Sequence, residues 1–212
     1  MRPSKGNLII VSGFSGAGKG TIMKRLVEKY PDSYALSVSA TSRSPRPGEE
    51  EGREYFFKTK EEFEKMIADD DLLEHACYVG NYYGTPKKYV FDKMEAGIDV
   101  ILEIEIQGAM QVKKMYPDSL LMFVSTPDAQ TLRERLSGRG TETEEVIKNR
   151  LCRACEEAMG VENYDYLVIN DDLETAVESV HAIAQNERFR IRNNIQFIDN
   201  IKNELKSFKE EK

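Results

Sequence analysis

The sequence predicts an α/β fold built on a parallel sheet, and three observations lead to this prediction. Short apolar runs rich in branched residues recur along the chain, helical patterns separate these runs, and the first run ends in a glycine-rich loop. Buried parallel strands read as continuous apolar runs, and strands that alternate with helices favour right-handed βαβ units. Ligands of such sheets bind beyond the carboxyl ends of the strands. The residues that follow each run are therefore the first candidates for a site.

Four apolar runs are the predicted core strands, and they cover residues 8–11, 100–105, 120–124 and 166–169. A helix is predicted over residues 21–29, directly after the first strand and its loop. From Asp172 onward the pattern predicts a long polar helix or a helix pair, whose charged end at residues 206–212 is expected to fray.

A smaller lobe is predicted between residues 34 and 83, where the pattern changes. Residues 34–39 alternate and residues 55–57 are aromatic, so both are predicted strands of a mixed sheet, with a helix over residues 61–68. Residues 137–140, Ser-Gly-Arg-Gly, interrupt two helical segments, and their glycines and charge predict a mobile flap.

Size and charge limit the possible functions. The chain has 212 residues, 40% of them hydrophobic, which suits one compact domain with inserted lobes. Its formal net charge of -7 gives no electrostatic reason to expect binding to nucleic acid or to an anionic membrane. No apolar run approaches the roughly 20 residues that cross a bilayer, and the start of the chain lacks a signal-peptide pattern. We expect a cytoplasmic protein.

The three cysteines predict no disulfide and no metal site. They are an odd number in a chain large enough to fold without cross-links, which suits a reducing compartment. Cys152 and Cys155 have a C-x-x-C spacing, but they lie in a helical pattern with no second Cys or His pair nearby. We interpret them as ordinary helix residues.

The strongest local motif is a glycine-rich loop between the first strand and its helix, with the spacing G-x4-G-K. Such a loop turns backbone N–H groups around phosphate oxygens, the helix N-terminus adds positive potential, and the lysine reaches the β- and γ-phosphates. Gly20 stands where the motif usually has Ser or Thr, so we expect Mg²⁺ to be held mainly through phosphates and water, near Glu103. The loop residues are Gly13, Phe14, Ser15, Gly16, Ala17, Gly18, Lys19, Gly20 and Thr21.

A second phosphate site is predicted in a loop stiffened by two prolines. Arg43 and Arg46 lie three residues apart there, and Tyr55 follows. Guanidinium groups match phosphate oxygens at two points, and a rigid loop lowers the entropy lost on binding. A solvated surface loop would have the same composition, so this stretch alone leaves both interpretations open.

Glu74 favours guanine as the base of a bound nucleotide. A single carboxylate accepts both the N1–H and the exocyclic amine of guanine, whereas adenine presents an acceptor at N1. Thr85 and Ser39 are candidates to donate to O6, and Tyr83 is a candidate for the phosphate. A lone Glu on a strand more often faces solvent, so Glu74 depends on these neighbours.

Charged residues at the end of the second core strand and in the flap complete the candidate site. Glu103 and Glu105 are two apart and are predicted to project from the same face, one toward hydrated Mg²⁺ and the other toward the acceptor. Phosphoryl transfer depends on charge stabilisation and in-line positioning, which arginines of a flap provide. The arginines of this part of the sequence are Arg133, Arg135, Arg139, Arg150 and Arg153.

Taken together, these motifs resemble guanylate kinase from Leu8 to about Ala184. The resemblance lies in SGFSGAGKGT, SVSATSRSPRPGEEEGREYFF, LLEHACYVGNYYGTP, LEIEIQG, RLSGRGTETEE and YDYLVIND, in that order. It implies a P-loop NTPase fold of three αβα layers with a five-stranded parallel sheet. It also implies an inserted α+β lobe that binds GMP and a small helical lid. The implied single domain has its core at 5–33, 97–130 and 155–212, its lobe at 34–96 and its lid at 131–154.

The resemblance also implies an activity and the roles of individual residues. ATP and GMP, or dGMP, would give ADP and a nucleoside diphosphate with Mg²⁺ as cofactor, in purine metabolism. The implied contacts are Ser39, Glu74 and Thr85 to guanine, and Arg43, Arg46, Tyr55 and Tyr83 to the GMP phosphate. The implied charge for the transfer comes from Lys19, Arg43, Arg139 and Arg150. Glu103 and Glu105 are implied near GMP, and Asn170 near the adenine.

Two other functions stay open from the sequence. One is a guanylate-kinase-like module that binds phosphopeptides without turnover, against which Lys19 and the lid arginines argue. The other is a P-loop kinase of another nucleoside monophosphate, such as AMP or UMP. The oligomeric state, monomer or homo-oligomer, does not follow from the sequence.

Overall fold

The main sheet has five parallel strands. The structure is a computed structural model that describes residues 5–78, 80–138 and 144–210. The strand order is β2-β7-β1-β8-β9, with every neighbouring pair parallel. The strands are β1 (Leu8–Gly13), β2 (Tyr34–Leu36), β7 (Asp99–Glu103), β8 (Leu120–Ser125) and β9 (Tyr166–Ile169). The predicted parallel α/β fold is confirmed.

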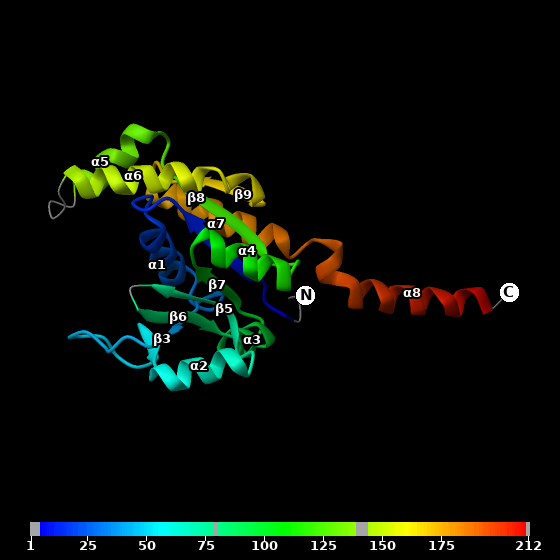
Figure 1. The fold of residues 1–212 in the computed structure, drawn as a ribbon. Coiled ribbons are helices and arrows are strands. Elements are labelled where there is room, and N and C mark those ends of the chain that lie inside the picture. Colours follow the sequence, from blue (N-terminus) through cyan, green and yellow to red (C-terminus); the bar gives the residue numbers. More distant parts are fainter. Residues whose placement is uncertain (1–4, 79, 139–143, 211–212) are drawn as a thin grey trace.

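Helices cover both faces of this sheet and make the fold three-layered (Figure 1). Side chains of β1 alternate between the two faces, so Ile9 and Val11 pack under one pair of helices while Leu8 and Ile10 pack under the other. The first pair is α1 (Lys19–Lys29) and α7 (Leu173–Glu187), and the second is α3 (Lys87–Glu95) and α4 (Ile106–Met115). β1 is central and buried, which fixes the glycine-rich loop at its carboxyl end.

The smaller lobe contains a mixed four-stranded sheet in the order β4-β3-β6-β5. One pair is parallel and two are antiparallel, and Phe63 of α2 packs against this sheet with Ala40 and Leu72. A capping box at Thr59 and Glu62 starts that helix. The elements are β3 (Ser39–Thr41), β4 (Tyr55–Phe57), α2 (Lys60–Ala68), β5 (Leu72–Tyr78) and β6 (Asn81–Pro86).

The first predicted strand of the lobe belongs partly to the core. Tyr34–Leu36 pairs with β7 in the main sheet, and only Ser39–Thr41 pairs within the lobe. The prediction that residues 34–39 are a lobe strand is therefore wrong for β2. Alternation of side chains indicates a strand but carries no information about its partner, and a two-residue break redirects the chain here.

Two helices span the segment 131–154 that was expected to be a lid. They are α5 (Ala129–Ser137) and α6 (Glu144–Ala158), and they pack together through Leu132, Leu136, Ile147 and Ala154. Asp128 caps the start of α5 by accepting from the Thr131 N–H at 2.7 Å. The predicted break between two helices is confirmed, while residues 139–143 of the predicted flap lie outside the described part of the chain.

The C-terminal helix projects away from the body, as Figure 1 shows. It follows the short helices η1 (Val161–Asn163), before β9, and η2 (Ile191–Asn194), after α7. This last helix is α8 (Ile195–Glu210), so residues 206–210 are helical where fraying was predicted. Within the described residues, no helix has the length and apolar character that a membrane span requires.

Candidate active site

The glycine-rich loop closes tightly between β1 and α1. Gly18 has φ 92°, a left-handed conformation, and is the N-cap of α1. A Cβ atom at this position would lie 2.4 Å from Nδ2 of Asn170, so both the conformation and the space require glycine. The Ala17 N–H donates to the Phe14 carbonyl at 3.0 Å. The loop therefore presents the N-terminus of α1 to the carboxyl edge of the sheet, as an anion site requires.

Lys19 lies inside this loop. Its ammonium donates to the carbonyls of Gly13 at 2.7 Å and Phe14 at 3.2 Å. Burial lowers the pKa of Lys19, and the carboxylates of Glu103, Glu157 and Glu105 oppose that shift. The charge is thus poorly hydrated, which strengthens its attraction for a phosphate.

Asn170 and Arg135 hold the loop from behind. Asn170 is buried, and its side-chain amide donates to the Ala17 carbonyl at 2.7 Å. Arg135 donates to the Asn170 carbonyl at 2.9 Å and to the Ala17 carbonyl at 3.4 Å. Asn170 was predicted near the adenine of ATP, and the structure places its side chain against the glycine-rich loop.

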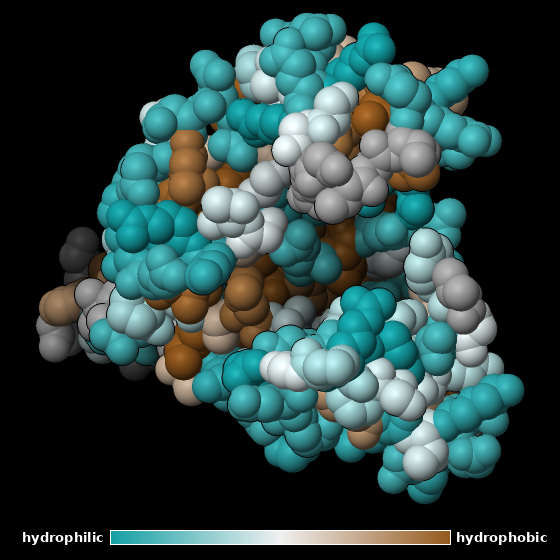
Figure 2. Space-filling model, turned by 90° about the vertical axis from the view of Figure 1, so that its left-hand side faces the viewer, coloured by the Kyte–Doolittle hydropathy of each residue, from teal (hydrophilic) through white to brown (hydrophobic). Residues whose placement is uncertain are grey.

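A cavity of about 560 Å³ opens in front of the loop. Ser15 and Lys19 line one wall, the end of β7 lines the floor, and α6 lines the opposite wall with Asn149 and Arg150. Figure 2 shows a hollow between the upper and lower parts of the molecule. Arg150 was predicted to act from the lid, and it faces this cavity. Arg139, the other predicted lid arginine, lies outside the described residues.

Glu103 and Glu105 lie at the floor and line this cavity together. Glu103 ends β7, whereas Glu105 lies beyond the strand as the N-cap of α4. The Ser12 hydroxyl donates to the Ile104 carbonyl at 2.7 Å and fixes this segment against β1. The surrounding protein desolvates the Glu103 carboxyl and raises its pKa, although the side chain faces the solvent of the cavity, and Lys19 opposes that shift. Both carboxylates line one cavity, but the prediction that they alternate along one strand is wrong, because β7 ends before Glu105.

A second cavity of about 520 Å³ lies on the other side of the same floor. It shares Tyr78, Glu103, Ile104, Glu105 and Arg153 with the first, so the two form one continuous cleft. Six of the predicted acceptor residues line it, namely Ser39, Tyr55, Glu74, Tyr83, Glu103 and Glu105.

Glu74 lines the second cavity, whereas Thr85, which was predicted to contact guanine, is fully buried behind Glu74 and is not part of the lining. The Thr85 hydroxyl, which is buried, donates to Oε1 of Glu74 at 2.8 Å. Burial raises the pKa of Glu74, and the hydrogen bonds from Thr85 oppose that shift. The pairing fixes one oxygen and turns the carboxylate toward the cavity, where it can accept from two neighbouring donors.

The arginine loop lies beside this cavity and is held by Glu49. The Glu49 carboxylate accepts from Nη2 of Arg43 at 2.9 Å and from the backbone N–H of Arg46 at 2.7 Å. The hydrogen bonds from Arg43 and from the backbone of Arg46 lower the pKa of Glu49. The guanidinium also lies 5.3 Å from the ring centre of Tyr55, which lines the cavity. The Arg46 side chain is exposed and is not part of the lining.

Several residues that line the cleft were not predicted from the sequence, or were predicted without a specific role. Arg153 and Glu157 of α6 line the first cavity, and Arg153 forms an ion pair with Glu105 at 2.7 Å. Val146, Arg150, Arg153 and Glu157 follow one another at intervals of three or four residues, and Asn149 lies four before Arg153, so all five share one face of α6. That periodic face was the available signal. For Tyr78, which lines both cavities, the sequence held no comparable signal.

The donor set suits a hydrated cation more than a closed metal site. Among the described residues there is no cluster of three or more His, Cys, Asp or Glu side chains that could hold a metal ion. Glu103 is a hard oxygen donor beside Lys19, and a Cβ atom at Gly20 would lie 3.7 Å from its Oε2. Cys152 and Cys155 are free and exposed on α6, where the predicted helix is confirmed.

Comparisons with known proteins agree on one family. The family model "Guanylate kinase" matches residues 5–187. The guanylate kinase of Streptococcus thermophilus (strain CNRZ 1066) is 49% identical over 187 residues, which cover 88% of this chain and 90% of that protein. That of Latilactobacillus sakei is 47% identical over 188 residues, 89% and 93% of the two chains. The crystal structure of guanylate kinase from Anaplasma phagocytophilum superposes with a TM-score of 0.68 at 30% identity, covering 88% of both chains.

Proposed function

The chain belongs to the guanylate kinase family, and from this premise we propose that it transfers the γ-phosphoryl group of ATP to GMP, giving ADP and GDP. The proposal extends to dGMP, because none of the residues assigned to guanine reads the sugar. We further propose that the enzyme acts in the cytoplasm, in purine nucleotide metabolism and the recycling of GMP.

ATP binds in the first cavity in this proposal. The amides of the glycine-rich loop surround the β-phosphate, and Lys19 turns from the Gly13 and Phe14 carbonyls to the β- and γ-phosphates. Arg150 and Arg139 contribute positive charge from the lid. Asn170 supports the loop through its bond to the Ala17 carbonyl, and any contact it makes with adenine is additional.

GMP binds in the second cavity. Glu74 is assigned the N1–H and the amine of guanine and Ser39 its O6, while Thr85, whose hydroxyl donates to Glu74, is assigned the orientation of that carboxylate. The phosphate is assigned to Arg43, Arg46, Tyr55 and Tyr83. Arg43 keeps donors to spare, because a guanidinium has five N–H groups and its bonds to Ser44 and Glu49 use only some of them.

Mg²⁺ is the proposed cofactor, carried with ATP. Glu103 is the side chain assigned to its hydration shell, since Gly20 offers no hydroxyl. The ion neutralises charge on the phosphates when bound. Glu105 is assigned to the acceptor side of the floor.

The chemistry needs no general base. A phosphate oxygen of GMP is already anionic at neutral pH, so it attacks the γ-phosphorus directly once the two nucleotides are in line. The protein's contribution is to place the two phosphates on either side of one floor and to surround them with positive groups. Closure of the lobe and lid excludes water, which would otherwise accept the phosphoryl group.

One observation carries this proposal: the cavity at the glycine-rich loop and the cavity lined by Glu74 share a floor. A coupled assay of ADP release tests it with GMP, dGMP, inosine monophosphate, AMP and UMP as acceptors. We expect GMP to give the highest kcat/KM. No turnover at micromolar enzyme would favour the phosphopeptide-binding alternative, and a preference for AMP would refute the assignment of Glu74.

Replacement of Lys19 tests the donor site. Lys19→Ala removes a desolvated charge from the transferring phosphates, so we expect kcat to fall by about 100-fold or more. Melting temperature should stay within about 2 °C, because the ammonium contacts only two backbone carbonyls. Lys24→Ala on the exposed side of α1 is the matched control and should leave both quantities unchanged. Normal turnover in Lys19→Ala with normal melting would contradict the assignment.

A further inference from the structure

The lobe and the lid each extend one side chain into the other's cavity. Tyr78 is the only described residue of the lobe sheet and α2 that lines the cavity at the glycine-rich loop. Arg153 is the only described residue of α5 and α6 that lines the acceptor cavity. Every other shared residue belongs to the floor. Tyr78 and Arg153 therefore mark the place where lobe and lid come together.

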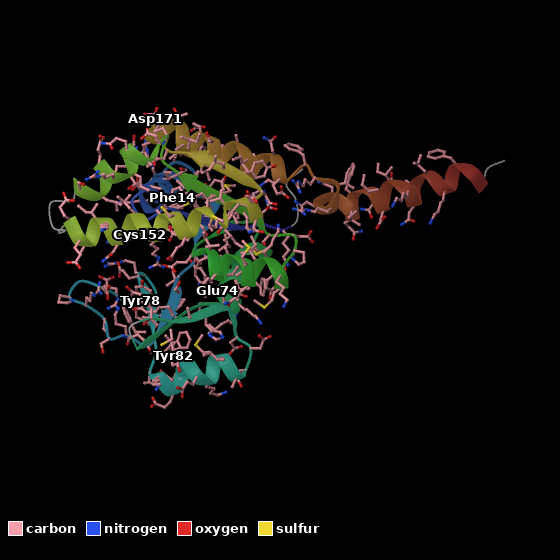
Figure 3. All side chains as sticks on the ribbon, turned by 45° about the horizontal axis from the view of Figure 1, so that its top comes forward. Phe14, Glu74, Tyr78, Tyr82, Cys152 and Asp171 are labelled. Atoms are coloured by element: carbon pink, nitrogen blue, oxygen red, sulfur yellow. The ribbon has the colours of Figure 1, made fainter. Side chains whose placement is uncertain are left out.

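The two side chains belong to elements that are rigid on their far sides. Tyr78 ends β5, which pairs with β6 through Ala76, Cys77 and Tyr78 itself. In α6 the opposite face, with Ile147 and Ala154, is packed against α5. Figure 3 shows Tyr78 on the lobe side of the cleft, across from α6, where Cys152 is labelled. If the lobe approaches the lid, the hairpin that carries Tyr78 and the helix that carries Arg153 each move as a rigid unit.

Both side chains have unused contact area in this structure. Tyr78 is 64% exposed, so most of its ring surface has no contact with protein. The Arg153 side chain is 48% exposed, and one edge of its guanidinium is held by Glu105 at 2.7 Å and by Glu157 at 3.5 Å. The face of the guanidinium plane is the part suited to stacking on an aromatic ring.

We propose that Tyr78 stacks on the Arg153 guanidinium when both nucleotides are bound, and that this contact holds lobe and lid in the closed state. Glu105 orients the guanidinium from the floor, so lobe, core and lid meet at one point. Tyr78 and Arg153 are positioning residues that stabilise the arrangement in which the two phosphates are in line. The proposal rests on the proposed function, because closure around two nucleotides is what the contact serves.

The chain offers a direct reporter for this contact because it contains no tryptophan. Tyr78→Trp gives a single indole at the proposed junction, and Trp stacks on guanidinium at least as well as Tyr. We expect its emission to shift to shorter wavelength with GMP and a non-hydrolysable ATP analogue together, and not with the analogue alone. Phe208→Trp on α8, where the native residue is 67% exposed, is the control and should show no shift.

Kinetics provide a second and independent readout. We expect Tyr78→Ala to lower kcat about tenfold while KM for GMP changes less than about threefold, because the contact forms only in the closed state. Tyr78→Phe keeps the ring and should retain kcat. Arg153→Met should lower kcat similarly, and the double variant should be no worse than either single variant.

The results separate this proposal from the proposed function. Absence of turnover in the unmodified protein with every acceptor would refute the function itself. Turnover of GMP that is unchanged in Tyr78→Ala, or additive effects of the two substitutions, would overturn the proposed contact alone. If the emission wavelength of Tyr78→Trp did not change when both nucleotides were added, the proposed contact would also be overturned. Unchanged melting temperatures, expected for exposed positions, exclude a folding defect as the cause.

Discussion

At the scale of single residues, the acceptor cavity depends on a pairing that the sequence only partly predicts. Glu74 and Thr85 are eleven residues apart, and the register of the β5–β6 hairpin, which opposes His75 to Gly84, brings them together. The residue types indicated guanine. The residue types did not predict that the Glu74 side chain is buried, because a bulge between Leu72 and His75 sets the direction of that side chain.

Glu74→Gln tests the reading of guanine. A glutamine keeps one acceptor but faces one guanine donor with its own NH₂ group, so kcat/KM for GMP should fall by about 30-fold or more. Inosine monophosphate lacks the exocyclic amine, so kcat/KM for this acceptor should fall by a smaller factor. Parallel kinetics with both acceptors measure the difference, and Glu28→Gln on exposed α1 is the control. Equal losses for the two acceptors would contradict the proposed contact.

The pKa of Lys19 predicts the alkaline side of the pH profile. Burial lowers this pKa below the ordinary lysine value, and the charged form is lost as pH rises through it. The alkaline limb of kcat/KM should therefore lie below pH 10.5. Because the Glu103 carboxylate raises the pKa of Lys19, Glu103→Gln should move this limb to lower pH, whatever its effect on the maximal rate.

A matched variant checks that shift. Glu162→Gln removes an exposed carboxylate that is not among those acting on Lys19, so its limb should coincide with that of the unmodified enzyme. If the alkaline limb of the kcat/KM profile had the same pH midpoint in Glu103→Gln as in the unmodified enzyme, a group other than Lys19 would control it.

At the scale of elements, the glycine-rich loop is the part that the sequence predicted best. Its motif and its position between a strand and a helix determine its local form, because both depend on residues close together in the chain. The hydrogen bond that supports the loop does not depend on nearby residues, since Asn170 lies 153 residues from Ala17. The pairing of β2 with β7 and the ion pair of Arg153 with Glu105 are long-range in the same sense, and local patterns could not give them.

Asn170→Ala tests this support. It removes a buried hydrogen bond to the Ala17 carbonyl, so we expect about 1–2 kcal/mol of lost stability and a higher KM for the nucleoside triphosphate. If the role is structural, the KM values for ATP and GTP should rise by the same factor. A change in the ratio between these two donors would instead favour the predicted contact with adenine.

At the scale of the whole molecule, one buried ion pair joins three distant segments. Asp99 at the start of β7 is fully buried, pairs with Arg188 after α7 at 2.8 Å, and accepts from the Asn7 N–H at 2.7 Å. None of these residues lies near the cleft cavities. No local pattern predicts this junction, since Asp99 stands alone between the apolar residues Ile98 and Val100 and Arg188 lies in a stretch of mixed charge.

Arg188→Met should destabilise the protein strongly. It leaves the Asp99 carboxylate buried without its cationic partner, which costs about 3–5 kcal/mol and lowers Tm by roughly 10 °C. Burial already raises the pKa of Asp99. A raised pKa in the folded state means that the penalty is present above that pKa and shrinks as pH falls through it. The deficit relative to the unmodified protein should thus be smaller at pH 5 than at pH 8.

Thermal melting at several pH values measures this effect. Arg190→Met is the control, because Arg190 is half-exposed and its partner Glu187 also pairs with Arg192. Its deficit should be within about 1 kcal/mol and should not shrink as pH falls. A deficit in Arg188→Met that is the same at both pH values would show that Asp99 is not the cause.

The projecting α8 has a practical consequence for handling the protein. Its sixteen residues extend about 24 Å, and of the described elements only η2 makes more than slight contact with it. If the protein were immobilised through a tag at that terminus, α8 would separate the body of the molecule from the sensor surface. The cleft would then be open to the flowing buffer. Nucleotide binding could then be followed on a tethered enzyme whose moving parts are unhindered.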